Sequence, residues 1–163
     1  MPRRLPEQPP GLPLLERGGA TCRLRFEVFQ DLNCPFSGRL VRTLRDHVLP
    51  ALERSDRVAT GSIEFNVVSV PQPWHSQSTN EHEVLLAVNA VRPSLFKSAL
   101  YALVDSQEDY FDAKSIDKSR RQLYKELVPI VSMGGSVLKM SKYLHSFLSV
   151  LYLCTSGIML YRR

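Results

Sequence analysis

The segment that most restricts the fold runs from residue 24 to residue 70, where two short apolar runs flank an amphipathic stretch. Residues 24–30, Leu-Arg-Phe-Glu-Val-Phe-Gln, place apolar side chains at alternate positions, which predicts a strand. Residues 63–70 predict a second strand. Between them, apolar residues at helical spacing predict a helix that begins at Pro35. Together these elements form a βαβ unit, whose strands pair in parallel.

The sequence after the second strand favours helices. Residues 78–81, Ser-Thr-Asn-Glu, have the pattern of a capping box, and Pro93 restarts a helix after the first one ends. Residues 107–111 predict a turn or a short helix, and residues 115–131 form a further amphipathic segment. In the first helix, Pro50 is expected to kink or end the helical path.

Two segments flank this partial α/β domain, which we assign to residues 22–132. Residues 1–21 are rich in proline and glycine and predict a flexible leader. No third strand is evident before residue 134, so we expect an incomplete sheet. Residues 133–163 form an atypical hydrophobic tail with four basic residues and no acid. Its uncharged part, residues 143–161, has about the length that crosses a bilayer. Three interpretations compete: a tail anchor, a substitute core helix or strand pair, and the end of a truncated or alternatively spliced product.

Charge and cysteine content narrow the function classes. The 163 residues carry a net charge of +5, but outside the tail 17 basic residues face 16 acidic ones, which gives little support for a nucleic-acid partner. The cysteines Cys22, Cys34 and Cys154 match neither a secreted disulfide framework nor the paired spacing of a zinc site. Prolines interrupt the N-terminus where a targeting signal needs an apolar stretch or an amphipathic helix. We therefore expect a cytoplasmic protein without a metal or a tightly bound cofactor, with a membrane tail anchor as the alternative.

Cys34 is the candidate nucleophile. It follows the first predicted strand and precedes Pro35, so it lies at the N-cap of the predicted helix. The unpaired N–H groups and the macrodipole at such a position favour a thiolate over a thiol. The alternative is that Cys34 is a buried packing residue, as many cysteines are.

The stretch from Phe29 to Ser37, Phe-Gln-Asp-Leu-Asn-Cys-Pro-Phe-Ser, resembles the active-site region of thioredoxin-fold proteins of the DsbA-like family. That family carries a helical insertion after the second strand of its βαβ unit, and the helices after Val70-Pro-Gln-Pro-Trp-His75 resemble it. The resemblance covers residues 22–131 and implies thiol chemistry at Cys34. It also implies a cis-proline loop, two further strands and a last helix, which this sequence does not show. We therefore expect a marginally stable or partner-dependent domain.

Ser37 marks the main departure from the family. Its disulfide exchangers have Cys-x-x-Cys, in which the second thiol resolves the mixed disulfide, and Ser37 occupies that second position. This departure favours monothiol chemistry, with glutathione as a candidate co-substrate. Ser37 is expected either to donate a hydrogen bond to the Cys34 thiolate or to satisfy a free N–H in the first helical turn.

Further candidate neighbours of the site come from the same motif and from one later loop. Pro35 and Phe36 belong to the motif, and Asp31 matches an acidic position often seen in the family; Asp31 caps a turn or takes part in proton transfer. His75, beside Trp74, follows the second strand, where the carboxyl ends of parallel strands bring loops together. The alternative is packing of the Trp–His pair. The remaining histidines, His47, His82 and His145, are expected at surface or amphipathic positions.

These observations lead to two hypotheses. The first is a thioredoxin-like, thiol-disulfide oxidoreductase-type protein with a single nucleophilic cysteine, weak or inactive in this form, whose partners are a thiol or disulfide substrate protein or glutathione. The second is a non-catalytic thioredoxin-fold binding module, associated with a membrane through residues 143–161. The sequence leaves the oligomeric state open.

Overall fold

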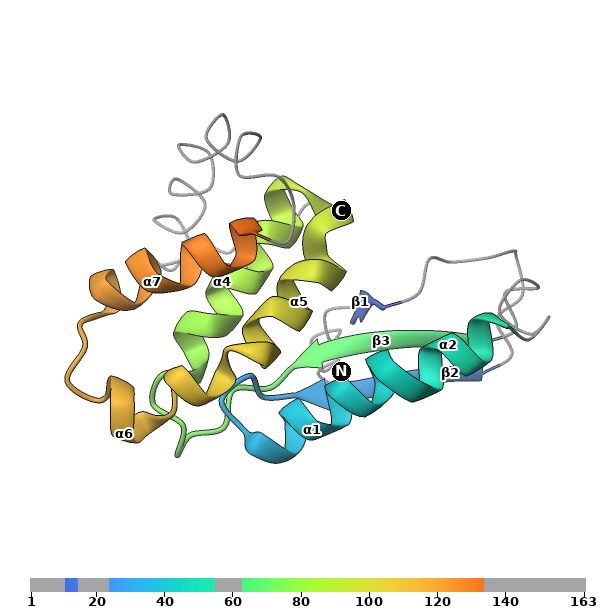
Figure 1. Cartoon of the computed structure of the whole chain (residues 1–163), viewed down its shortest axis with the longest axis horizontal. Helices are drawn as coiled ribbons and strands as arrows, with labels where there is room; N and C mark the ends of the chain where they lie inside the picture. The colour runs from blue at the N-terminus through green and yellow to red at the C-terminus, as the bar shows by residue number, and fades with distance from the viewer. Residues whose placement is uncertain (1–10, 15–23, 55–62, 134–163) are drawn as a thin grey trace, which may run out of the picture.

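The computed structural model describes residues 11–14, 24–54 and 63–133 (Figure 1). In this part of the chain a three-stranded sheet has the strand order β1-β3-β2. The strands are β1 (Leu12–Pro13), β2 (Leu24–Gln30) and β3 (Ile63–Ser69). β2 and β3 are parallel, in register from Leu24 opposite Ile63 to Gln30 opposite Ser69. The predicted α/β class and the parallel βαβ unit are confirmed.

β1 corrects two predictions, because it lies in the leader that was expected to be flexible and adds a third strand. Leu12 pairs antiparallel with Val67 of β3. Pro13 is tolerated in this position because β1 is an edge strand of the described sheet. The next residue, Leu14, donates its N–H to the Phe65 carbonyl at 2.9 Å and buries its side chain in the core. This burial favours the ordered position of residues 11–14.

The crossover between β2 and β3 is one helical path in three parts, and it lies along one face of these strands (Figure 1). The parts are α1 (Pro35–Thr43), the π-helical turn η1 (Leu44–Val48) and α2 (Leu49–Glu53). Leu49 donates its N–H to the Leu44 carbonyl, five residues earlier, directly before Pro50. Pro50 has no N–H to donate, and the path continues through it into α2. Of the two outcomes expected at Pro50, an end of the helix is therefore wrong.

The remaining helices lie beyond the carboxyl ends of β2 and β3 (Figure 1). They are α4 (Ser78–Val91), η2 (Pro93–Leu95), α5 (Phe96–Asp105), η3 (Gln107–Asp109), α6 (Asp112–Ser115) and α7 (Arg120–Met133). Pro93 restarts the helical path as predicted. Fully buried leucines pack α4, α5 and α7 together: Leu85, Leu100, Leu103, Leu123 and Leu127. Pro129 is accommodated within α7 at an exposed position.

The capping box predicted at the start of α4 does not form. Gln77 is the N-cap, and no side chain caps the helix. The hydroxyl of Ser78 instead donates to Asp31 at 2.5 Å, and the carboxyl group of Glu81 accepts a hydrogen bond from Asn33 at 3.0 Å. The two side chains that the pattern assigned to the helix itself therefore reach the loop after β2.

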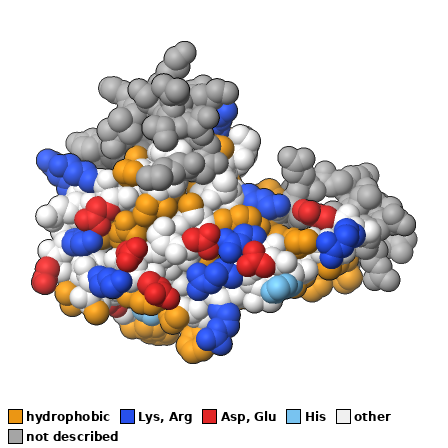
Figure 2. All heavy atoms as spheres, viewed as in Figure 1, with side chains coloured by type: hydrophobic (Ala, Val, Ile, Leu, Met, Phe, Trp, Pro, Cys, Tyr) orange, Lys and Arg blue, Asp and Glu red, His pale blue; other side chains and the backbone are white. Residues whose placement is uncertain are grey.

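Basic and acidic side chains are interspersed over the face shown in Figure 2. On the crossover, for example, Arg45 pairs with both Asp46 and Asp105. No helix in the described part of the chain is long and apolar enough to cross a membrane. The predicted anchor segment at 143–161 lies outside the described residues, as do Cys22, Cys154 and His145.

Candidate active site

Cys34 lies between β2 and α1 at the N-cap, as predicted, and Pro35 takes the first helical position. The Cys34 carbonyl accepts the N–H of Gly38 at 3.0 Å, which closes the first turn of the helix. The cysteine is half-buried and not part of a disulfide. Phe36, two residues later, is 75% exposed. The thiol of Cys34 thus lies near the surface, at the positive end of a helix dipole.

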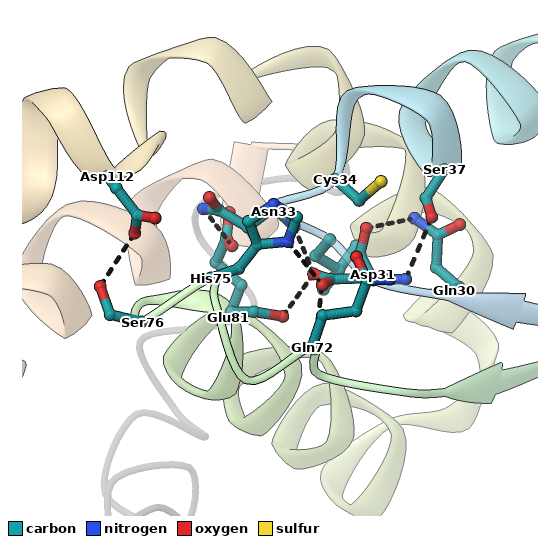
Figure 3. Close-up of polar contacts among 12 residues, drawn as sticks. Gln30, Asp31, Asn33, Cys34, Ser37, Gln72, His75, Ser76, Glu81 and Asp112 are labelled. Atoms are coloured by element: carbon teal, nitrogen blue, oxygen red, sulfur yellow. Dashed lines mark hydrogen bonds and ion pairs between the residues drawn. The ribbon is translucent and has the colours of Figure 1, made fainter.

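Asp31, which directly follows β2, is the centre of a buried hydrogen-bond network (Figure 3). Its Oδ1 accepts the Asn33 N–H at 2.9 Å and the Ser78 hydroxyl at 2.5 Å. Its Oδ2 accepts the Gln72 N–H at 3.0 Å and lies 2.7 Å from His75 Nδ1. Burial acts to raise the pKa of Asp31, but these hydrogen bonds outweigh it and lower the pKa below its usual value. Asp31 is therefore a buried carboxylate, and its bond to Asn33 is the turn-capping contact anticipated from the sequence.

His75 approaches Asp31 from the loop after β3, the place where the sequence predicted loops to gather. Its Nδ1 faces the Asp31 carboxylate, so the proton on that nitrogen is directed at the acid. In Figure 3 the Cys34 sulfur points toward the side of Ser37, whereas the His75 ring lies against Asp31. Trp74 contacts the His75 ring edge-on at 6.2 Å between centroids but is 66% exposed. The packing expected as the alternative for the Trp–His pair is therefore present as this edge-on contact, although Trp74 is mostly exposed.

Ser37 contacts the backbone of Asp31. Its Oγ accepts the Asp31 N–H at 3.4 Å. Among the described residues no hydrogen bond joins Ser37 to the sulfur of Cys34. The structure thus places this hydroxyl as the acceptor for a free N–H at the end of β2, and not within the first turn of α1. The structure brings Asp31, Cys34, Ser37 and His75 together as a group, with Asp31 at the centre.

His82 corrects a sequence prediction, because it is buried and not at the surface. It is 2% exposed, and its Nε2 accepts the Leu32 N–H at 3.2 Å. Burial lowers the pKa of His82 to about 4, so the imidazole is neutral at physiological pH. Since Nε2 accepts, the proton of the neutral ring is on Nδ1. His47, by contrast, is exposed as predicted.

Glu81 is a second site residue that the sequence analysis missed. It is 1% exposed, and its Oε2 accepts a hydrogen bond from Asn33 Nδ2 at 3.0 Å. Burial raises the pKa of Glu81 to about 8; the bond from Asn33 lowers it, and the nearby Asp31 and Asp112 charges raise it further. The carboxyl group is therefore mostly protonated at neutral pH. The sequence carried one signal of this burial: Glu81 is an acid at helical spacing with apolar residues, and such an acid faces the core only in an unusual environment.

Gln107, in η3, bonds to the residues before and after Asn33. Its Nε2 donates to the Leu32 carbonyl at 2.8 Å and to the Cys34 carbonyl at 2.7 Å. The side chain is 1% exposed, and a Cβ atom added at Gly38 would lie 2.1 Å from its Oε1. Glycine at position 38 is therefore required by the close approach of Gln107 to α1.

Replacing Gly38 by alanine is expected to lower the free energy of unfolding by about 2 kcal/mol, because Gln107 must move and lose its bonds to the two carbonyls. Urea denaturation measures the change. In a Gln107→Ala background the clash is gone, and alanine is the better helix former, so Gly38→Ala should then be neutral or stabilising. An equal cost in both backgrounds would contradict this account.

Exposed apolar side chains lie near Cys34 in the chain and in the loop that contacts Asp31. They are Phe29 at the end of β2, Phe36 in α1, and Val70 and Trp74 after β3. Nothing in the described ranges gathers three or more His, Cys, Asp or Glu side chains in a way that could bind a metal ion. The site is thus a half-buried thiol beside a buried carboxylate network, with apolar residues in the adjoining segments.

Comparison with known proteins identifies the fold. No family model matches the chain, and no curated protein matches it in sequence. The structure is similar to that of a proposed protein-disulfide isomerase from Pseudomonas syringae, with a TM-score of 0.57 and 18% identity. The similarity covers 92% of this chain and 82% of that one. The chain therefore shares the α/β fold of that structure, which agrees with the fold class that the resemblance implied.

Proposed function

We propose that this chain is a thiol-disulfide oxidoreductase-like protein in which Cys34 is the single nucleophile. The observation that carries the proposal is the half-buried, free Cys34 at the N-cap of α1. Its thiolate would attack one sulfur of a substrate disulfide, form a mixed disulfide and release the other sulfur as a thiolate. A second thiol, such as glutathione, would then attack the mixed disulfide and release Cys34 as a thiolate.

The scheme needs an external thiol because position 37 is not a cysteine. Serine replaces the cysteine that would resolve the mixed disulfide, and Ser37 is engaged with the backbone of Asp31. The exposed Phe36 and Trp74 favour a protein disulfide as the first substrate, since apolar side chains contact peptide segments well. A reducing cytoplasm would supply glutathione, and the cytoplasmic location and the alternative tail anchor stay predictions.

A second candidate function is a non-catalytic binding module with the same fold. The observation that favours it is the set of hydrogen bonds that fix the loop around Asp31. His75 takes part in this set, and no hydrogen bond joins it to Cys34 among the described residues. In this case the apolar side chains near Cys34 would bind a partner without disulfide exchange.

Incubation with oxidised glutathione separates the two candidates. We expect a glutathione adduct on the Cys34 peptide, detected by mass spectrometry, to form about tenfold faster in the folded chain than in urea at pH 7. Cys34→Ser should abolish that adduct, whereas Cys22→Ser and Cys154→Ser serve as matched controls and should retain it. A folded-state rate no higher than the rate in urea would overturn the proposed chemistry and favour the binding module.

A further inference from the structure

Glu81 is a buried acid that the chemistry proposed above does not use. Its Oε2 accepts the hydrogen bond from Asn33, but its Oε1 has no partner among the described residues. Buried polar atoms without a partner are uncommon in folded proteins, and each one costs free energy. Glu81 lies on α4 and contacts Asn33, the residue that precedes Cys34. This position suggests that the unpartnered carboxyl oxygen has a role in the function of the cysteine.

Asn33 connects Glu81 to the cysteine. Its Nδ2 donates to Glu81 and, at 2.8 Å, to the Tyr110 carbonyl, while its backbone N–H donates to Asp31 at 2.9 Å. Asn33 is thus fixed through its side chain and its backbone at once. Cys34 directly follows Asn33. Glu81 is therefore connected to the cysteine through one residue, which is held by hydrogen bonds at both its side chain and its backbone.

The groups around Glu81 do not favour a second negative charge. Asp31 and Asp112 both add negative potential at its carboxyl group. Burial keeps His82 neutral and raises the pKa of Tyr110 to about 12, so the phenol is also neutral. Lys118 lies over the Tyr110 ring and pairs with Glu126, and His75 pairs with Asp31. An ionised Glu81 would therefore place a second charge beside Asp31 without an ion-pair partner among the described residues.

We propose that Glu81 positions Cys34 by holding Asn33, and that the negative charge Glu81 gains on losing its proton slows the reaction of Cys34 with disulfides and alkylating reagents. With Glu81 neutral, Asn33 is held and Asp31 is the charged carboxylate of the pair. With Glu81 ionised, the added negative charge disfavours the Cys34 thiolate that these reactions need. The pKa of about 8 places this change just above neutral pH.

Alkylation of Cys34 by iodoacetamide between pH 6 and pH 9.5 tests the proposal in the full chain. Mass spectrometry of the Cys34 peptide gives the rate for wild type, Glu81→Gln and the matched control Glu108→Gln, which removes an exposed acid. We expect Glu81→Gln and wild type to agree within about twofold at pH 6.5, and Glu81→Gln to react about threefold faster above pH 9. Glu108→Gln should follow wild type. A constant ratio of the Glu81→Gln and wild-type rates over the whole range would overturn the proposal.

A measurement on the wild-type chain keeps the test decisive if Glu81→Gln does not fold. The side-chain amide resonances of Asn33 should shift with a midpoint near pH 8, the pKa of the acid that they contact. Their invariance between pH 7 and pH 9.5 would overturn the proposal. The disulfide step of this inference rests on the proposed function, but alkylation does not. Absence of the glutathione adduct would therefore remove the oxidoreductase function alone, and a constant alkylation ratio would remove the role of Glu81 alone.

Discussion

Replacing Asp31 by alanine is expected to lower the free energy of unfolding by roughly 4 kcal/mol, because one substitution removes the acceptor of several buried hydrogen bonds. The N–H groups of Asn33 and Gln72 and the hydroxyl of Ser78 all donate to this carboxylate. Leaving a buried donor unpaired costs about 1–3 kcal/mol. His75, with its side chain 18% exposed, loses less because water can reach it. Chemical denaturation at pH 7 measures the total.

Two further variants make this result specific. Asp31→Asn keeps one acceptor oxygen but directs an NH₂ group at existing donors, so its loss should be intermediate. Asp112→Asn is the matched control, because its hydrogen bond to Ser76 is exposed, and it should cost less than about 1 kcal/mol. The pKa of Asp31 is lowered, so its stabilisation is present above the ordinary value of 3.8 and is lost as the pH falls below it. A loss under about 1 kcal/mol for Asp31→Ala would show that the network does not stabilise the fold.

The second large effect is a pH dependence of stability caused by Glu81. Its pKa rises from 4.5 in the unfolded chain to about 8 in the folded chain. Between these values the folded chain binds a proton that the unfolded chain has released, so rising pH favours unfolding. The contribution of Glu81 to the free energy of unfolding should fall by about 1.4 kcal/mol per pH unit across this window. Glu81→Gln cannot ionise, so its stability relative to wild type should increase from pH 4.5 to pH 8 and then stay level.

The comparison of wild type with Glu81→Gln separates the effect of Glu81 from that of His82, another buried group that titrates. The pKa of His82 falls from 6.5 to about 4 on folding, so its neutral form stabilises the fold above pH 6.5, and this stabilisation is lost as the pH drops toward 4. That loss is common to wild type and Glu81→Gln and cancels in their difference. Urea unfolding at half-unit pH intervals gives the difference curve. A flat curve between pH 5 and pH 8 would mean that Glu81 is already ionised in the folded chain.

The βαβ unit could be predicted from the sequence because its signals are local. Alternating apolar residues mark β2, and Pro35 marks the start of α1 within the same short stretch. β1 could not be predicted in this way. A two-residue strand has no period of its own, and Leu12 is fixed by pairing with Val67, far along the chain. At Leu12 and Pro13, tertiary pairing thus overrides the flexible character that the proline- and glycine-rich sequence predicted.

In the candidate site, too, the residues with local sequence signals could be predicted and those fixed by long-range contacts could not. Cys34, Asp31 and Ser37 lie in one motif, so sequence reasoning found them together. Glu81 and Gln107 reach the loop across 48 and 75 residues of chain. The helical spacing of Glu81 with apolar residues indicates burial, but no local pattern predicts which residues the two side chains contact. The residues at 78–81 illustrate the difficulty, because a serine and a glutamate at this spacing suit a helix cap equally well. Only the packed structure shows that both side chains instead bind the loop after β2.

The hydrogen bonds around Cys34 also show whether the βαβ unit could hold the cysteine loop without the helical region. The main-chain groups of Leu32 and the carbonyl of Cys34 are satisfied by His82 and Gln107, which belong to the helical region and not to the βαβ unit. A fragment ending after β3 would keep the cysteine, its strand and its helix, yet would leave these groups and the Asp31 carboxylate without their partners from α4 and η3. A protein engineer who wished to graft this thiol onto another scaffold would therefore have to transfer the helices with it, because their side chains hold the cysteine loop in place.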